Sequence, residues 1–115
     1  ADAVKNNKSK QGDFEKIYEA ARQIPEGCVT SYGRLARLAG LPNGARTAGW
    51  AMMAVPDGWD VPAHRVVHAD GSLCVGHEWE GLQRQMLIAE GVAMTPSGKV
   101  NMARHLWQPE AVHGL

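Results

Sequence analysis

Apolar residues recur at helical spacing near the start of the chain. The spacing predicts a helix from Asp13 to about Gln23 with one apolar face. The residues of that face, at positions i, i+3, i+4 and i+7, are Phe14, Ile17, Tyr18 and Ala21. Asp13 is suited to cap the helix, and Pro25 and Gly27 are expected to end it.

Two shorter helices are predicted next, over residues 32–40 and 44–55. Ser31 is expected to cap the first and Asn43 the second. The residues expected to face inward from the first are Leu35 and Leu38. Two short helices joined by a few residues that include Gly or Pro are typical of a helix-turn-helix, with the second as the recognition helix.

The second half of the chain mixes strand and helix signals. The run 64–76 has Asp70-Gly71 between two strand-like stretches and predicts a small β-hairpin. A fourth helix is expected over 79–89, and Trp107 is expected to dock on the body. The apolar face of the fourth helix is predicted to contain Leu82, Met86 and Ala89.

The whole pattern predicts a mainly α (α+β) fold, a winged-helix-like helix-turn-helix domain with a small hairpin. We expect a flexible N-terminal arm (1–12), one domain (13–108) and a C-terminal tail (109–115). No run of 18 apolar residues is present, so no membrane span is expected. The arm has no apolar core and is not expected to be a secretory signal. Two cysteines fit a reduced protein of the cytoplasm.

Charge changes this picture only locally. The 12 basic and 12 acidic residues cancel, which by itself argues weakly against nucleic acid. Residues 27–56, however, contain Arg34, Arg37 and Arg46 and no acid. The recognition helix carries small residues, including Ala45, Ala48 and Gly49, around its one long cation, Arg46. Such a helix can press into a minor groove, although small residues also serve close helix packing.

Several stretches together resemble the DNA-binding domain of O6-alkylguanine-DNA alkyltransferases. They are "IPEGCVTSYGRLARLAGLPNGARTAGWAM", "VPAHRVV", "DGSL" and "LIAEGV", within about residues 14–95. In that family the motif is Pro-Cys-His-Arg-Val, and its cysteine accepts the alkyl group. Here the cysteine position is occupied by Ala63, and a methyl group cannot act as a nucleophile.

The surrounding residues favour the alkyltransferase-like proteins, which lack the cysteine naturally and bind alkylated DNA without repairing it. The Gly-Tyr-Ser-Gly-Gly-Leu stretch of active enzymes is replaced by "VGHEWEGLQRQ", and Val55 stands where the enzymes have a buttressing Asn. The ending "HLWQP" also resembles that group. Many of its members have tryptophan at the position of Ala63. An alkyltransferase mutated to alanine is the alternative.

The resemblance implies roles for individual residues. Tyr32 would crowd the phosphate beside the lesion and help rotate the nucleotide, and Arg46 would fill the gap left in the base stack. The remaining groove-facing residues would be Ala45, Ala48 and Gly49. The lesion pocket would be formed by Tyr32, Val55, Pro62, Ala63, His64 and Arg65. His64 and Glu90 match the pair that activates cysteine in the enzymes, and here we expect both to shape the pocket.

The implied function is non-enzymatic recognition of damaged DNA. The protein would bind duplex DNA in the minor groove, flip O6-alkylguanine into a pocket and flag it for nucleotide excision repair, with the damage-recognition proteins of that pathway as partners. It would act as a cytoplasmic monomer, associated with the nucleoid when bound to DNA. No cofactor is implied.

Other interpretations follow from individual residues. Cys74 could be a displaced nucleophile, and a zinc site could involve Cys74, His77, His64 and His68, although paired ligand spacings are missing. A winged-helix regulator would read undamaged sequence. For Arg65, a structural hydrogen-bonding role is expected more than a DNA contact, because buried polar groups in the loops need partners. The tryptophans are expected in the core more often than as stacking platforms: Trp50, Trp59, Trp79 and Trp107.

Overall fold

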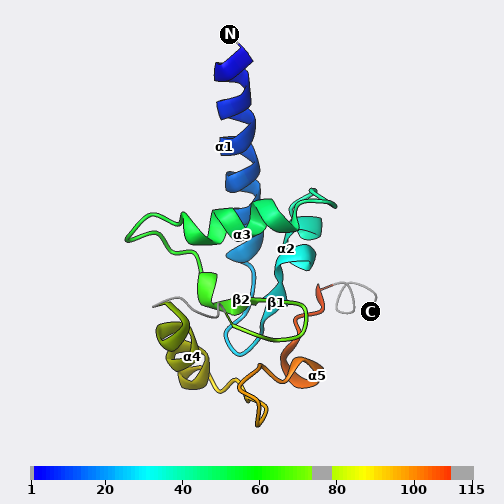
Figure 1. Ribbon diagram of the computed structural model, residues 1–115, viewed down its shortest axis with the longest axis vertical. Coiled ribbons are helices and arrows are strands. Elements are labelled where there is room, and N and C mark those ends of the chain that lie inside the picture. Colours follow the sequence, from blue (N-terminus) through cyan, green and yellow to red (C-terminus); the bar gives the residue numbers. More distant parts are fainter. Residues whose placement is uncertain (1, 74–78, 110–115) are drawn as a thin grey trace.

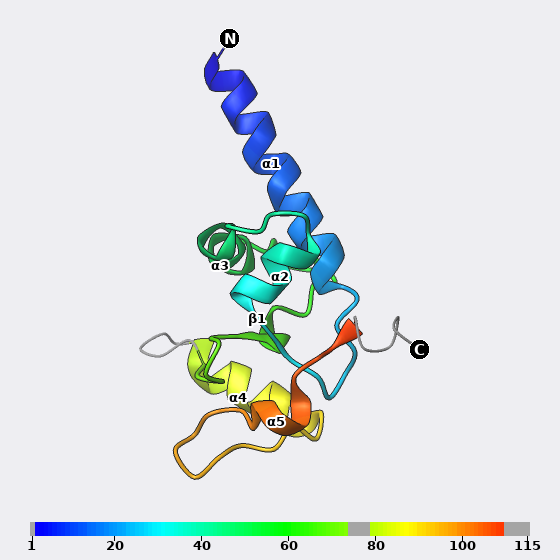
Figure 2. The same ribbon diagram turned by 90° about the vertical axis from the view of Figure 1, so that its right-hand side faces the viewer.

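The computed structural model describes residues 2–73 and 79–109. Helices α1 (Asp2–Ala21), α2 (Tyr32–Leu38) and α3 (Ala45–Met53) pack against one another, and α3 crosses α1 (Figure 1). Below them lie the strands β1 (Thr30–Ser31) and β2 (Val66–Val67), then α4 (Trp79–Ala89) and α5 (Met102–His105) (Figure 2). The mainly helical fold with a small sheet is therefore confirmed. No helix of the described residues combines the length and apolar character that a membrane span needs.

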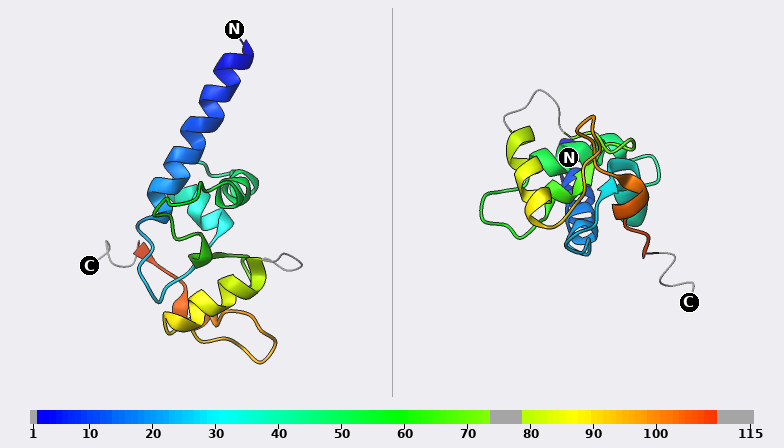
Figure 3. Two further views of the ribbon diagram at one scale, coloured as in Figure 1. Left: turned by 90° about the vertical axis from the view of Figure 1, so that its left-hand side faces the viewer. Right: turned by 90° about the horizontal axis from the view of Figure 1, so that it is seen from below.

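Helix α1 is anchored by the apolar face that the spacing predicted. Ile17, Tyr18 and Ala21 are buried, and Phe14 packs against them. The expected start at Asp13 is wrong, because α1 already begins at Asp2 and its N-terminal part extends away from the body (Figure 3). No proline interrupts residues 2–12, so the anchored helix continues upstream. The expected boundary at residue 12 thus falls inside a helix, while the flexibility of residues 1–12 stays a prediction.

The helix-turn-helix is present. The N-cap of α2 is the predicted residue, whereas that of α3 is not. The hydroxyl of Ser31 accepts a hydrogen bond from the Arg34 amide at 3.2 Å, as expected. The N-cap of α3 is Gly44 and not Asn43, and no side chain caps it. A Cβ atom at this position would lie 2.8 Å from the Leu41 Cβ, so the tight turn before α3 requires glycine there.

Helix α2 buries a narrower face than the sequence suggested. Leu35 and Ala36 are fully buried, whereas Leu38 is 39% exposed. Leu38 is the last residue of this seven-residue helix. The expectation that Leu38 faces inward is therefore wrong.

The two strands pair in parallel, and they do not form the predicted hairpin. Thr30 aligns with Val66 and Ser31 with Val67. A turn does occur at Asp70-Gly71, where the His68 amide donates to the Ser72 carbonyl at 3.0 Å. Both valines are fully buried, however, and a two-stranded hairpin alone leaves such side chains uncovered. Part of the expected second strand, residues 74–76, lies outside the described residues.

The sheet separates two apolar cores. One lies among α1, α2 and α3, and the other is formed by Val29, Val67, Leu73, Leu87, Val92 and Val100. The predicted bounds of α4 are confirmed, but its inward residues are Gln83 and Leu87. Leu82 and Met86, which were predicted to share one apolar face with Ala89, are 51% and 36% exposed, so that face does not belong to a core. Trp107 docks on the first core as expected, and its amide donates to the Val29 carbonyl at 2.7 Å.

Candidate nucleic-acid interface

A groove of about 680 Å³ runs along the exposed side of α3. Four of the five predicted DNA-binding residues line it, namely Tyr32, Ala45, Arg46 and Gly49. The fifth, Ala48, is wrong as a groove residue, because it is fully buried in the core. At 100° per residue, Ala48 falls on the opposite side of the helix from Arg46 and faces the core.

Arg46 is the cation of this groove. Arg46 is exposed, and no acidic side chain of the described residues forms an ion pair with it. Tyr32 begins α2, and its ring lies 5.2 Å from the ring of His68 between centroids. An extended guanidinium beside aromatic rings on a surface of small residues suits contact with phosphates and bases.

Sequence reasoning missed the aromatic part of the groove. Trp50 is 56% exposed and lines the groove one helical turn after Arg46, so its expected place in the core is wrong. Trp59 is 51% exposed and packs edge-on against Tyr18, with ring centroids 5.8 Å apart. The signal available in the sequence was the i, i+4 spacing of Arg46 and Trp50 on one helix.

A second cavity of about 620 Å³ lies on another side of α3. Three of the residues predicted for a lesion pocket, Val55, Ala63 and His64, line this cavity together. Its other apolar lining residues come from α3, the following loop and α4: Met52, Met53, Pro56, Val61, Trp79, Leu82 and Met86. We call this cavity the hollow. Leu82 and Met86, predicted on one apolar face of the helix, thus line the hollow.

Three predicted pocket residues are not brought to the hollow. Tyr32 lines the groove, Pro62 precedes the short 3-10 helix η1 (Ala63–Arg65), and Arg65 is not among the lining residues. Arg65 is engaged by Glu90 and by a backbone carbonyl, which explains its absence from the cavity. Of the adjacent motif residues, Ala63 and His64 line the hollow, and Arg65 supports it through its contacts with Glu90.

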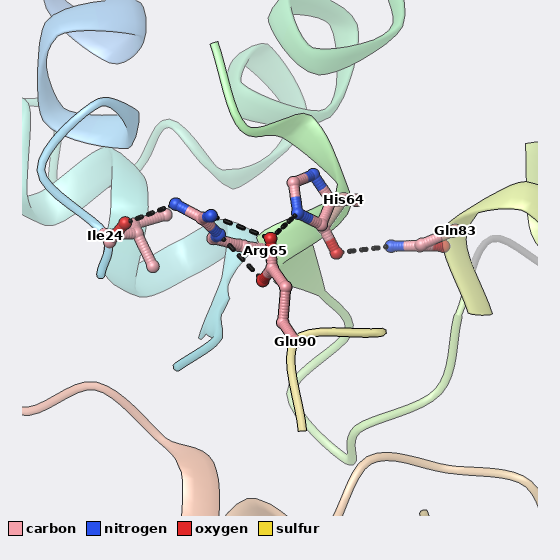
Figure 4. Close-up of polar contacts among 5 residues, drawn as sticks. All are labelled: Ile24, His64, Arg65, Gln83 and Glu90. Atoms are coloured by element: carbon pink, nitrogen blue, oxygen red, sulfur yellow. Dashed lines mark hydrogen bonds and ion pairs between the residues drawn. The ribbon is translucent and has the colours of Figure 1, made fainter. Parts of the chain in front are cut away.

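Arg65, Glu90 and His64 form a hydrogen-bonded cluster beside the hollow (Figure 4). The carboxylate of Glu90 accepts from Arg65 Nε at 3.0 Å and from Arg65 Nη2 at 2.7 Å. It also lies 2.7 Å from His64 Nε2. Arg65 Nη1 donates to the Ile24 carbonyl at 2.9 Å, which confirms the structural role expected for this arginine.

The electrostatics of this cluster favour the ionised carboxylate. Burial by itself raises the pKa of Glu90, but the hydrogen bonds from Arg65 and His64 outweigh burial and lower the pKa from 4.5 to about 2. The hydrogen bond with Glu90 raises the pKa of Arg65 above its ordinary value. The cluster therefore contains a permanent ion pair at neutral pH.

Gln83 connects α4 to the segment that contains Ala63 and His64. This fully buried side chain donates from Nε2 to the His64 carbonyl at 3.3 Å (Figure 4). It also donates to the Val66 carbonyl at 3.1 Å. The backbone on both sides of Arg65 is thereby fixed to α4. Nothing in the sequence distinguished Gln83 from an ordinary surface glutamine.

Among the described residues, no thiol, hydroxyl or amine side chain lines the hollow. Ala63 presents only a methyl group, and Cys28 is a partly buried free thiol packed against the first core. Cys74 and His77 lie outside the described residues. Within those residues, no group of three or more His, Cys, Asp or Glu side chains is placed to hold a metal ion. This arrangement can bind and orient a flat apolar group beside Ala63.

Comparisons with known proteins agree with this geometry. The family model for the DNA-binding domain of 6-O-methylguanine DNA methyltransferase matches residues 13–92. The DNA base-flipping protein of Escherichia coli K12 is 39% identical over 93 residues, which cover 81% of this chain and 72% of that protein. Alkyltransferase-like protein 1 of Schizosaccharomyces pombe is 35% identical over 102 residues, covering 84% and 94%.

Solved structures give the same result. Schizosaccharomyces pombe Atl1 in complex with damaged DNA containing O6-carboxymethylguanine aligns with a TM-score of 0.73 at 34% identity, covering 84% of this chain and 94% of that one. The O6-methylguanine methyltransferase of Mycobacterium tuberculosis aligns with a TM-score of 0.60 at 35% identity, covering 67% and 47%.

Proposed function

Because this chain belongs to the family of the 6-O-methylguanine DNA methyltransferase DNA-binding domain, we propose that it recognises alkylated DNA without repairing it. The observation that carries the proposal is the hollow itself. It has the size of a ligand pocket, within ~300–1,000 Å³, and it contains Ala63 where the family motif has its cysteine. A methyl group cannot accept an alkyl group, so binding is the activity that this site supports.

The groove along α3 supplies the DNA contact in this proposal. The small residues Ala45 and Gly49 let the helix backbone approach the minor groove closely, and Arg46 extends from the same surface. Flipping a nucleotide costs a few kcal/mol, and a guanidinium that stacks in the vacated gap offsets part of that cost. An alkylated guanine pairs poorly, so its rotation out of the duplex is less costly.

The flipped base enters the hollow, and its O6 substituent lies against the apolar walls. His64 and Glu90 hold each other in place beside the hollow, and no thiol of the described residues lines it for them to activate. Since the hollow is wide and Ala63 is small, we expect large O6 substituents to bind at least as well as methyl. Comparing O6-methylguanine with O6-benzylguanine duplexes tests this, and a strict preference for methyl would contradict it.

The bound lesion then requires a repair system, and we propose nucleotide excision repair. The protein would act as a monomer in the cytoplasm, associated with the nucleoid through its DNA contacts. A reconstituted bacterial excision reaction on an O6-alkylguanine duplex tests the handover. Addition of the protein should increase incision beside the lesion. Unchanged incision would overturn the handover to excision repair and leave the proposal of lesion binding in place.

Fluorescence anisotropy of short duplexes tests the central proposal. One duplex contains O6-methylguanine at a single position and its control contains guanine, at one fixed salt concentration. We expect tighter binding to the lesion and recovery of chemically unchanged DNA. Equal binding to both duplexes would overturn lesion recognition. An alkyl adduct on the protein, detected by mass spectrometry, would instead establish transfer to another residue such as Cys74.

A further inference from the structure

The walls of the hollow are apolar on both of its sides. Met52 and Met53 belong to α3, and Trp79, Leu82 and Met86 belong to α4. Leu82 is half exposed because it borders this cavity and not a core. Thioether side chains are polarisable and rotate easily, so methionines on both sides adapt to apolar groups of different shape.

The charged groups near the hollow give no available cation among the described residues. Asp57 is an exposed acid on the lining, and the imidazole of His64 is bound to Glu90. The guanidinium of the neighbouring Arg65 is committed to Glu90 and to the Ile24 carbonyl. His64 and Arg65 thus both engage the single carboxylate of Glu90.

An anionic substituent therefore loses water in the hollow without gaining a partner. Transfer of a polar group into apolar surroundings without a compensating hydrogen bond is unfavourable, and more so for a carboxylate than for a neutral group of the same shape. The carboxylate of Asp57 adds like-charge repulsion. A neutral alkyl or aryl substituent meets neither cost.

From these contacts we propose that the hollow selects guanines with uncharged O6 substituents and discriminates against anionic ones. The inference rests on the proposed function, because it concerns the substituent of a flipped guanine. It also separates this chain from Schizosaccharomyces pombe Atl1, whose complex contains O6-carboxymethylguanine.

Three lesions in one duplex sequence test the selection. They are O6-carboxymethylguanine, its near-isosteric neutral amide O6-carbamoylmethylguanine, and O6-propylguanine, with guanine as the reference. We expect the carboxymethyl lesion to bind at least fivefold more weakly than the amide, with propyl the tightest. Equal binding of carboxymethyl and amide lesions, both tighter than guanine, would overturn the charge selection alone. Loss of preference over guanine for all three would overturn the proposed function as well.

A charge added to the wall sharpens the test. Leu82→Arg places a cation at a half-exposed position of the hollow, and Ile88→Arg places the same cation on the same helix at a 55% exposed position that does not line it. The measured quantity is the affinity ratio of carboxymethyl to amide lesions, in which general phosphate attraction cancels. Leu82→Arg should raise this ratio at least fivefold, and Ile88→Arg should leave it unchanged. An unchanged ratio in Leu82→Arg, or an equal rise in both variants, would overturn the proposal.

Discussion

The groove and the hollow lie on two sides of one short helix, and they differ in how their charges are used. In the groove, Arg46 is exposed and unpaired among the described residues. Beside the hollow, Arg65 is held by Glu90 and a carbonyl, and the lining is mostly apolar. One helix thus separates a surface suited to a charged backbone from a surface suited to an apolar substituent.

The largest expected effect comes from removing the charge of the cluster. Glu90→Gln leaves the guanidinium of Arg65 without its carboxylate, and breaking a buried pair in this way costs about 3 kcal/mol of the free energy of unfolding. Urea unfolding measures it. The matched control is Glu80→Gln, whose pair with Arg84 spans one turn of α4 at 3.4 Å with both side chains about one-third exposed. We expect less than about 0.5 kcal/mol there, and equal losses would show that the cluster is no stronger than a surface pair.

Acid should remove the same contribution gradually. The pKa of Glu90 is about 2 in the folded protein and 4.5 as its ordinary value, so the folded state binds the proton less readily. Stabilisation is complete above about pH 4.5 and is lost as pH falls toward 2. Asp70 acts in the same direction, because hydrogen bonds from Ser72 and Lys99 lower its pKa.

The difference in unfolding free energy between wild type and Glu90→Gln isolates the Glu90 contribution. Urea titrations at several pH values should show this difference shrinking below pH 4.5. A constant difference down to pH 2 would mean that Glu90 is not the titrating group.

A smaller effect is expected on the groove side. Arg46→Ala should weaken binding to an O6-methylguanine duplex by about tenfold, and binding to undamaged DNA by less, because the guanidinium loses its stacking in the vacated gap. Anisotropy on both duplexes measures it, with Arg22→Ala on α1 as the control cation, paired there with Glu19. Equal losses on both duplexes would reduce Arg46 to a phosphate contact.

The smallest effect concerns two tryptophans of similar exposure. Trp50 borders the groove, whereas Trp59 packs against Tyr18 away from it. Trp50→Ala should weaken binding to damaged and undamaged duplexes alike by about threefold, since an exposed indole on this face contributes about 0.5–1 kcal/mol. Trp59→Ala should leave DNA affinity unchanged. Equal effects of the two substitutions would show that the groove does not hold the DNA.

Local signals in the sequence predicted more of the fold than of its long-range contacts. The stripe of α1, the Ser31 cap and the bounds of α4 depend on neighbouring residues and were anticipated. The pairing of Thr30 with Val66 joins distant segments, and an Asp-Gly turn favoured a local hairpin instead. The burial of Ala48 followed from helical geometry, whereas its small size had suggested a groove contact.

The candidate site was anticipated chiefly through the resemblance. Glu90 was matched to His64 by motif, and the structure places the two side chains in contact. Leu82 and Met86 were predicted on one face of α4, but their place in the hollow was not, because a helical stripe has the same spacing whether it faces a core or an open cavity. Gln83 was missed because its partners are backbone carbonyls, which every residue has and which no sequence pattern identifies.

Met53 lines both the groove and the hollow, while Met52 and Met86 line the hollow alone. A methyl group labelled with carbon-13 at each of these positions therefore gives a spectroscopic reporter for a different event. Undamaged DNA in the groove should shift the Met53 resonance and leave those of Met52 and Met86 in place. A flipped base should shift all three, so one titration distinguishes docking from extrusion.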